Sequence, residues 1–391
     1  MHVNPSASLP ATHHPIFVWV LAPHLQTNDA NIDYYYDFSQ SIEEYTKVFT
    51  ELQLNWKWQP VTQENYTSMI DVIAATTSFQ TPIVLNLCDG DEVNGTPGVS
   101  VIHYLKQKQL IYTGADAAFY DYTTSKIVMK ELFDKAGIPH AKWVAITNPA
   151  QKLNGICNYI GTPLIVKPAV SGGSMGLGVK NVVHNDDELK TLVQELFEGY
   201  RGWDFSFGGL VAEEFINGPE YTVFLSGSYH TPRSRKVYPP VERIFHKDLP
   251  DTEKFLSFDR LWETYEKEKP LGEYEDFYQY HLPPIALHKK IMDLSWKAYC
   301  AVEGTGYGRI DIRMDKATGK LYVLEVNAQC GLSEDENYTS IGAIVRLSNQ
   351  SYTGLILHIL QDAMQRHYKK QKKTVAAVSY THLRAHETVL D

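Results

Sequence analysis

The sequence predicts an α/β protein in which a parallel layer of strands and helices is followed by units of α+β type. Apolar strand-like and helix-periodic segments alternate through the first part of the chain. Glycines and serines gather between two later strands, at 171–178. Near the C-terminal end a hairpin carries regularly spaced polar residues. With 391 residues the chain is long for one core, so two or three packed units are expected.

The first unit is expected to be a parallel α/β layer over residues 1–118. Mostly apolar segments at 16–22, 82–87 and 110–113 are typical of buried strands. The intervening segments 41–52 and 99–107 have apolar residues at helical spacing. Strands and helices that alternate at these lengths predict a parallel sheet.

The second unit, residues 119–209, is expected to carry the glycine-rich loop. A helix is predicted from 123 to 136 because Gly137 and Pro139 form a stop signal after it. Strands at 163–168 and 179–183 flank the loop. A P-loop or dinucleotide fingerprint needs a helix directly after its glycines, so this placement disfavours both. The loop is equally consistent with an ordinary turn and with backbone N–H groups that cradle a triphosphate.

The third unit, residues 210–370, is expected to begin with a pair of strands, 210–216 and 220–225, joined by Asn217-Gly218-Pro219. The stretch 228–283 has little periodicity and is typical of a functional loop or lid. Helices are expected at 287–302 and 351–366. Residues 371–391 are expected to be a disordered or artefactual tail, because their end fits no preceding pattern.

Polar residues in the predicted hairpin point to a metal site. The strands 308–313 and 324–327 alternate polar and apolar residues across a turn at 315–320. This pairing places Asp311, Glu325 and Asn327 on one face. Two carboxylates and an amide oxygen are the hard ligands that Mg²⁺ takes when a nucleotide phosphate completes its shell. A nucleotide-dependent magnesium enzyme is therefore predicted.

Composition limits the partners that we expect. The net charge of −10 argues against a nucleic-acid surface. No stretch approaches eighteen apolar residues, so no membrane span is expected. The four cysteines have no metal-binding spacing and are typical of reduced thiols in a cytoplasmic protein.

Taken together, the segments between residues 85 and 363 resemble the ATP-grasp superfamily, and within it the branch similar to D-alanine–D-alanine ligases. The motifs that carry the resemblance are, in order, Leu110–Gly114, Ile165–Pro168 with its glycine-rich loop, Glu213–Glu220, Gly308–Asp311, and Glu325–Asn327 with Gly331. Their order and separations are specific, although each motif alone is common. The resemblance implies an ATP-grasp fold preceded by a parallel α/β pre-ATP-grasp domain.

The resemblance also implies that the cofactors are ATP and two Mg²⁺ ions, with Mn²⁺ as an alternative. Lys167 would contact the α-phosphate, and the loop with Ser171, Gly173 and Ser174 would close over the β- and γ-phosphates. Glu213 and the backbone of Glu214 and Ile216 would hold adenine, and Glu220 the ribose hydroxyls. Lys126 would replace the charge of a family lysine whose position falls on Tyr122.

The implied catalytic set contains Arg309, Gly331 and Ser174. Arg309 and the N–H of Gly331 would stabilise the oxyanion of a tetrahedral intermediate, while Asp311, Glu325 and Asn327 would hold the magnesium ions. Simpler interpretations exist for single residues: Lys167 as a solvated strand-end lysine, Glu213-Glu214 as an exposed acidic pair, and Arg309 with Asp311 as a structural ion pair. Glu325 between Leu324 and Val326 is hard to interpret in this way, because a buried carboxylate needs a cation or a paired charge.

The substrate-binding positions of the family are altered in this sequence. The segment 23–30 lacks the glutamate found after the first strand. The family's serine and tyrosine for the first D-alanine fall near Gly173 and Trp262. Its Ser-Leu pair for the second substrate's carboxylate falls near Glu336-Asn337. We therefore expect substrates other than two D-alanines.

The expected reaction joins a small carboxylic acid to an amine that resembles an amino acid, through an acyl phosphate. One alternative is an ATP-grasp enzyme that passes the acyl phosphate to a non-amine acceptor. Another is an inactive ATP-binding module, and a third, suggested only by the glycine run, is a Rossmann-type oxidoreductase. The N-terminal layer would suit a homodimer.

Overall fold

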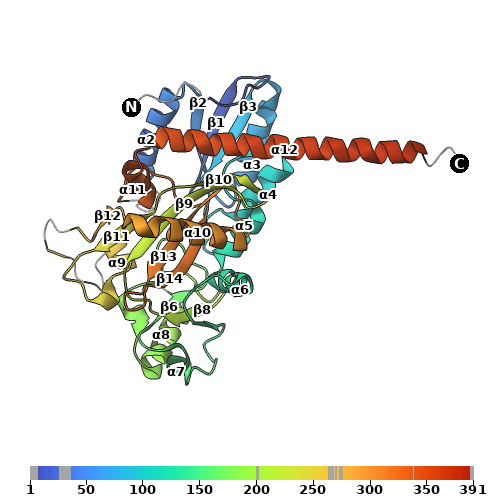
Figure 1. Ribbon diagram of the computed structural model, residues 1–391. Helices are drawn as coiled ribbons and strands as arrows, with labels where there is room; N and C mark the ends of the chain where they lie inside the picture. The colour runs from blue at the N-terminus through green and yellow to red at the C-terminus, as the bar shows by residue number, and fades with distance from the viewer. Residues whose placement is uncertain are drawn as a thin grey trace.

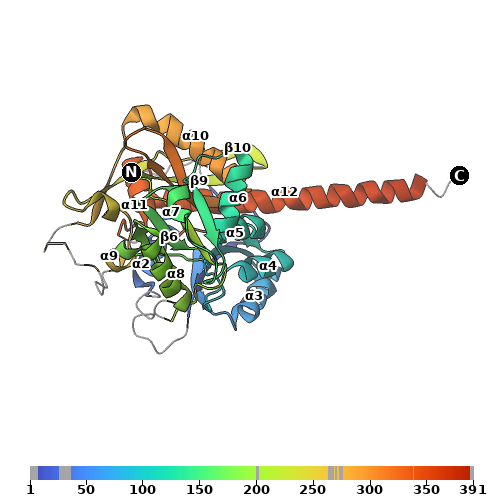
Figure 2. The same cartoon turned by 90° about the horizontal axis from the view of Figure 1, so that it is seen from below.

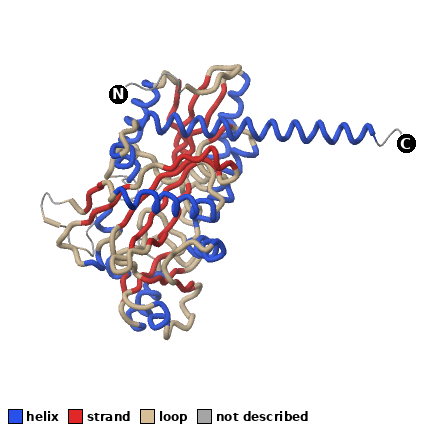
Figure 3. Tube along the Cα trace, in the orientation of Figure 1, coloured by secondary structure: helices blue, strands red, loops and turns tan. Residues whose placement is uncertain are grey.

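The computed structural model describes residues 8–25, 37–199, 202–262, 268, 271–272, 276–337 and 339–387, the last 17 of these by backbone alone. They form three sheets of four, six and four strands. Figure 1 shows the N-terminal sheet at one end, the small glycine-loop unit at the other, and the six-stranded sheet between them. Helices lie outside the strands of these layers (Figure 3).

The N-terminal sheet is parallel throughout, as predicted, with the strand order β2-β1-β3-β4. Its strands are β1 (Ile16–Pro23), β2 (Asn55–Val61), β3 (Thr81–Asn86) and β4 (Ile111–Tyr112). Its helices are α2 (Ser39–Glu51), α3 (Tyr66–Ala75), η1 (Thr76–Ser78) and α4 (Val99–Gln107). The pair β2 and α3 was not predicted. β2 is an edge strand, which is why it tolerates Pro60 and lacks a continuous apolar run.

The small unit is an antiparallel sheet with the order β5-β8-β6-β7. It contains β5 (Trp143–Ile146), β6 (Leu164–Pro168), β7 (Val182–Val183), β8 (Leu210–Glu214), α7 (Ile156–Ile160) and α8 (Asp186–Glu198). The strand predicted at 179–183 is wrong in its first part, where η2 (Val179–Asn181) forms instead. The Asn181 side chain holds this turn by donating to the carbonyls of Val166 (2.8 Å) and Gly176 (2.9 Å).

The helix predicted over 123–136 is in fact two helices, α5 (Ala117–Thr124) and α6 (Lys126–Ala136). Ser125 between them is extended and forms a β-bridge with Val170. The Lys126 N–H donates to the Ala169 carbonyl at 2.8 Å. The break therefore ties the start of α6 to the segment that enters the glycine-rich loop.

The large sheet has the order β12-β11-β9-β13-β14, with β10 attached to β9. Its strands are β9 (Glu220–Ser228), β10 (Thr231–Val237), β11 (Val241–Phe245), β12 (Tyr278–His281), β13 (Tyr307–Met314) and β14 (Leu321–Ala328). The remaining helices are η3 (Asp251–Glu253), α9 (Phe258–Leu261), α10 (Ile285–Ala301), α11 (Ser340–Leu347) and α12 (Tyr352–Glu387). Ordered strands thus occupy part of the stretch expected to be loop or lid.

One prediction about this unit needs correction. β8 and β9 do not pair: β8 belongs to the small sheet and β9 to the large one, so the chain crosses between the sheets at 215–219. The backbone of 371–387 continues α12, and no glycine or proline follows Gly354 within this helix. In both ribbon views the end of α12 extends beyond the body of the protein (Figures 1 and 2).

The N-terminal layer and the large sheet share one apolar core. Tyr45 of α2, Phe224 of β9, Tyr307 of β13 and Ile356 of α12 are all buried in it. This shared core fixes the N-terminal layer against the strands that carry the site. No helix among the described residues combines the length and apolar character needed to cross a bilayer.

Candidate active site

A cavity of about 610 Å³ is lined by residues from all three units. Every residue predicted for the site lines it: Lys126, Lys167, Ser171, Gly173, Ser174, Glu213, Glu214, Ile216, Glu220, Arg309, Asp311, Glu325, Asn327 and Gly331. The crossing at 215–219 contributes its edge, since the small sheet lies on one side and the large sheet on the other.

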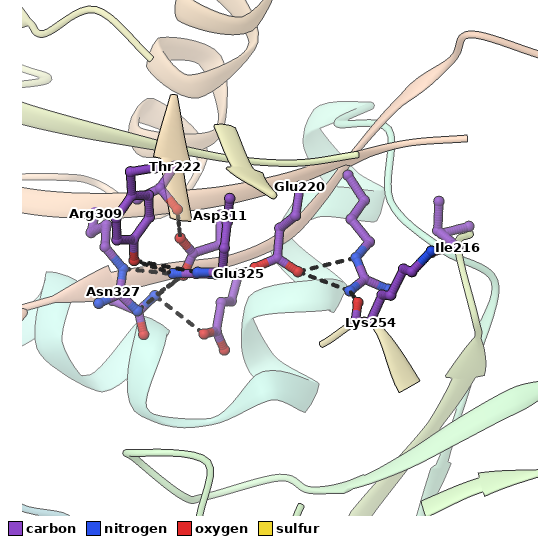
Figure 4. Close-up of polar contacts among 11 residues, drawn as sticks. Ile216, Glu220, Thr222, Lys254, Arg309, Asp311, Glu325 and Asn327 are labelled. Atoms are coloured by element: carbon purple, nitrogen blue, oxygen red, sulfur yellow. Dashed lines mark hydrogen bonds and ion pairs between the residues drawn. The ribbon is translucent and has the colours of Figure 1, made fainter. Parts of the chain in front are cut away.

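The predicted hairpin is present as β13 and β14, with Asp311 opposite Glu325 and Arg309 opposite Asn327. Figure 4 shows these polar side chains converging. Asp311 Oδ1 accepts from the Thr222 hydroxyl at 2.8 Å, and its Oδ2 accepts from Arg309 Nε at 3.1 Å. Asn327 Nδ2 donates to Asp311 Oδ2 at 3.1 Å and to Glu325 Oε1 at 3.3 Å.

The charges of this hairpin are arranged to take a cation. Burial and the nearby Glu325 raise the pKa of Asp311, although Arg309 opposes the rise. Burial would also raise the pKa of Glu325, but Lys126, Lys167 and Arg309 bring it below its ordinary value. Among the described residues no group of three or more His, Cys, Asp or Glu gathers as a metal cluster. The candidate set is therefore two carboxylates and one amide.

Glu213 forms a buried ion triad with two lysines. Lys167 Nζ lies 2.7 Å from Glu213 Oε1, and Lys130 Nζ pairs with Glu213 Oε2. Burial opposes ionisation of Glu213, but the lysines outweigh it and lower its pKa to about 2. Both carboxylate oxygens are engaged, so the side chain positions Lys167 in the cavity. The interpretation of Glu213-Glu214 as an exposed acidic pair is wrong for Glu213, which is 2% exposed.

Glu220 lies between two arginines in one row across three strands. Arg243 of β11 and Arg313 of β13 are its register partners on β9. Arg313 Nε donates to Glu220 Oε2 at 3.1 Å and its Nη1 to the Ile216 carbonyl at 3.1 Å, while Arg243 pairs with Glu220 Oε1. Arg243 also donates to the Tyr280 hydroxyl, at 2.9 Å from Nη2. This network fixes the edge of the cavity where ribose binding was predicted.

The glycine-rich loop is attached to the segment around α9. The indole N–H of Trp262 donates to the Gly173 carbonyl at 2.9 Å, and the Phe258 N–H to the Leu177 carbonyl at 2.7 Å. Glu268 Oε1 accepts from the Val179 N–H at 2.8 Å. Gly173 and Trp262, the positions of the family's serine and tyrosine, are therefore in direct contact. Lys126 Nζ donates to the Ser171 carbonyl at 3.2 Å, near the other end of the loop.

The N-terminal layer meets the large sheet through Gln329. Its Oε1 accepts from the Ala115 N–H at 3.0 Å, and its Nε2 donates to the Asn86 carbonyl. Gln329 is 1% exposed and directly precedes Cys330 and Gly331, which line the cavity. The loop after β3, with Asp89, Gly90 and Asp91, lines the cavity beside them.

Glu336 does not line the cavity. Its carboxylate pairs with Arg346, whose Nη2 lies 2.8 Å from Oε2. Thr339 and Ser340, at the start of α11, line the cavity instead. Glu336 therefore gives no support to the expectation that the substrates differ from two D-alanines. The other altered segment, 23–30, lies outside the described residues from position 26 onward.

Several residues of the cavity or its support were missed in the sequence. Lys130 interrupts the apolar face of α6 between Met129 and Phe133, a signal that a buried cation there needs an anion. Arg243 has no comparable signal, because its position depends on how β11 pairs with β9.

Known proteins share this fold. Residues 132–361 match the family described as D-ala D-ala ligase C-terminus, which is more than half of the chain. A D-alanine–D-alanine ligase from Bacillus anthracis complexed with ATP superposes with a TM-score of 0.62 and 17% identity, over 90% of this chain and 99% of that chain. The enzyme from Coxiella burnetii gives a TM-score of 0.64 and 16% identity, over 93% and 99%.

The fold is thus an ATP-grasp fold preceded by a parallel α/β domain, and it places the chain among ligases that form C–N bonds. The chain belongs to the D-alanine–D-alanine ligase family, as defined by the C-terminal domain of these enzymes.

Proposed function

We propose that the protein joins a carboxylic acid to an amine by consuming ATP, through an acyl phosphate. The observation that carries the proposal is the single cavity in which Lys167, Arg309 and the oxygens of β13 and β14 meet. The relative from Bacillus anthracis, which its structure shows complexed with ATP, supports the choice of nucleotide. The parallel N-terminal layer supplies the remaining wall, where an amine acceptor would enter.

In this proposal, a substrate carboxylate attacks the γ-phosphorus of ATP, and ADP leaves. Lys126 and Lys167 offset the negative charge of the phosphates, and the loop 171–178 with Ser174 excludes water from them. An amine then attacks the acyl carbonyl, and phosphate leaves. Arg309 donates to Asp311 through Nε and Nη2 and leaves Nη1 out of this pair. Nη1 can therefore hold the oxyanion together with the Gly331 N–H.

Two magnesium ions, with Mn²⁺ as the alternative, fit the hairpin. The atoms of its candidate set that would bind the ions are all oxygens. Burial and the neighbouring Glu325 raise the pKa of Asp311, so a bound cation would offset a negative charge that is unfavourable there. A half-turn of the Asn327 amide would present its oxygen in place of its NH₂ group. The ions would neutralise charge on the phosphates during transfer.

The remaining roles stay predictions. The backbone of Glu214 and Ile216 would hold adenine at the crossing. Glu220 would accept hydrogen bonds from the ribose hydroxyls through the oxygen lone pairs that Arg243 and Arg313 do not use. We also propose a homodimer and a cytoplasmic location.

The test is a screen of ADP release with small carboxylic acids and amino acids, singly and in pairs. We expect release to require one acid and one amine together. Hydroxylamine in place of the amine should yield a hydroxamate, because it traps an acyl phosphate. Hydroxamate without dependence on any amine would favour the non-amine acceptor, and no ADP release with any pair would favour the inactive module.

A further inference from the structure

The loop after β3 contains three acidic residues, of which two are committed to the loop itself. Asp91 accepts from the backbone and side-chain N–H groups of Asn94, at 3.0 and 2.9 Å. Glu92 accepts from the Gly98 and Ser100 N–H groups and from the Ser100 hydroxyl. These bonds hold the loop in one shape. They leave Asp89 as the carboxylate of this loop that remains available to a ligand.

Asp89 presents its carboxylate to the cavity from a fixed position. It follows directly on the end of β3, its side chain is exposed, and it lines the cavity. Within the described part of the chain, its oxygens have no hydrogen-bond or ion-pair partner apart from its own backbone N–H. The neighbouring Gly90 carbonyl accepts from the Tyr120 hydroxyl at 2.7 Å, which ties the loop to α5.

A second lining residue of the same cavity also indicates a polar ligand. Ser340 is 2% exposed, lines the cavity, and its hydroxyl has no hydrogen-bond partner among the described residues. A buried hydroxyl without a partner costs free energy unless a ligand or water completes it.

We propose that Asp89 binds the ammonium group of the acceptor and takes the proton that must leave nitrogen before it attacks. The inference rests on the proposed function and adds the residue that selects and activates the amine. No lysine or arginine is found in the described part of the loop 87–98. A cationic acceptor would therefore meet a carboxylate here, with no competing positive charge from the loop.

The chemistry balances as follows. The acceptor ammonium transfers one proton to Asp89, and the freed nitrogen lone pair forms the C–N bond. The C–O bond to phosphate then breaks, its electron pair leaves with phosphate, and phosphate takes the second proton from nitrogen. Asp89 returns its proton to solvent. Although the Asp89 side chain is accessible from the cavity, desolvation by the protein around it raises its pKa to about 6, which suits a general base that works near neutral pH.

Two parallel assays on the full chain test this role, with Asp89→Asn, Asp89→Glu and the control Asp37→Asn. Asp37 also lines the cavity, but its Oδ1 accepts from the Ser39 N–H. The first assay supplies ATP, a panel of small carboxylic acids and hydroxylamine, which is neutral at pH 7 and needs no ammonium site. The second replaces hydroxylamine with a panel of amino acids, and with ammonium chloride as the smallest ammonium acceptor.

For Asp89→Asn we expect hydroxamate within about twofold of wild type and amide formation at least ~100-fold slower, the usual contribution of a general base. Asp89→Glu should recover part of the amide rate, and Asp37→Asn should match wild type in both assays. Amide formation by Asp89→Asn at the wild-type rate would overturn the role, as would equal losses in both assays. Absence of hydroxamate from the wild type would instead overturn the proposed function itself.

Discussion

Arg243 and Glu220 face each other across β11 and β9, and their side chains form an ion pair that is almost completely buried. Arg313 completes the row from the other side. Burial opposes ionisation of Glu220, but the two arginines outweigh it and keep its pKa below the ordinary value. Two buried positive charges thus depend on one carboxylate at the edge of the cavity.

Glu220→Gln should destabilise the protein by about 3–5 kcal/mol, because two buried arginines would lose their counter-charge. Urea unfolding at pH 7 measures this difference. Glu336→Gln is the matched control, since Glu336 pairs with Arg346 at the surface and should change stability by less than about 1 kcal/mol. Equal effects of the two substitutions would contradict the network.

The Glu213 triad predicts a pH dependence of stability. The pKa of Glu213 is about 2 in the folded protein, against an ordinary value of 4.5. Its contribution is therefore complete above pH 4.5 and is lost as the pH falls toward 2. The free energy of unfolding, measured with urea at pH 7 and pH 3, should decrease less between the two pH values in Glu213→Gln than in wild type. An identical decrease in both proteins would contradict a lowered pKa of Glu213 in the folded protein.

Arg309→Lys should lower kcat by about 10²–10³-fold, because lysine lacks the planar set of donors that spans Asp311 and an oxyanion. The KM for ATP should change little. Steady-state kinetics with the acid and amine found in the screen separate the two constants. Arg346→Lys, on the surface, serves as the control, and a change confined to KM would argue against an oxyanion role.

Trp262→Phe removes the hydrogen bond to the Gly173 carbonyl and should raise the KM for ATP by about fivefold, as expected for one net hydrogen bond of about 1 kcal/mol. Protease digestion with and without ATP would report the order of the loop 171–178. Trp143→Phe is the control, because the indole of Trp143 donates to Asp134 at an exposed position. An unchanged KM would show that this contact does not help to close the loop.

If Asp89 is the base, kcat/KM for the amine should decrease as the pH is lowered through an apparent pKa of about 6. The reason is that the Asp89 carboxylate must be ionised to take a proton. Burial raises the pKa of the nearby Cys88, Tyr120, Tyr307 and Cys330 further above their ordinary values, so these four groups stay protonated near pH 6. Asp91 and Glu92 are engaged by the loop. The acid limb should be absent from the pH–rate profile of Asp89→Asn, and its persistence there would assign it to another group.

The parallel layer and the β13–β14 hairpin were predictable because each depends on patterns within short segments. Apolar runs identify buried strands, and strict alternation with a turn identifies a hairpin. The break at Ser125 and the separation of β8 from β9 were not predictable in this way. Both depend on which distant strand or loop the backbone pairs with, Val170 in the first case and β6 in the second.

The site shows the same limit. Asp311, Glu325 and Lys167 belong to motifs that can be recognised in the sequence, and all three line the cavity. The partners that restrain them, such as Thr222, Lys130 and Arg243, come from other elements, and only the register of the sheets brings them near. The resemblance assigned Glu213 and Glu220 to the nucleotide, but their contacts show that lysines and arginines occupy their oxygens first.

Gln329 has a consequence for how substrate choice can change in this family. One amide joins the end of β3 and the turn after β4 to the residues beside Gly331. The loop 89–98 is braced by its own carboxylates and is attached to this joint at its base. If Asp89 binds the acceptor, an exchange of that loop alone should replace the acceptor's contacts and leave Lys167, Arg309 and the β13–β14 hairpin in place. Transplanting the loop between relatives should then change which amine the protein accepts.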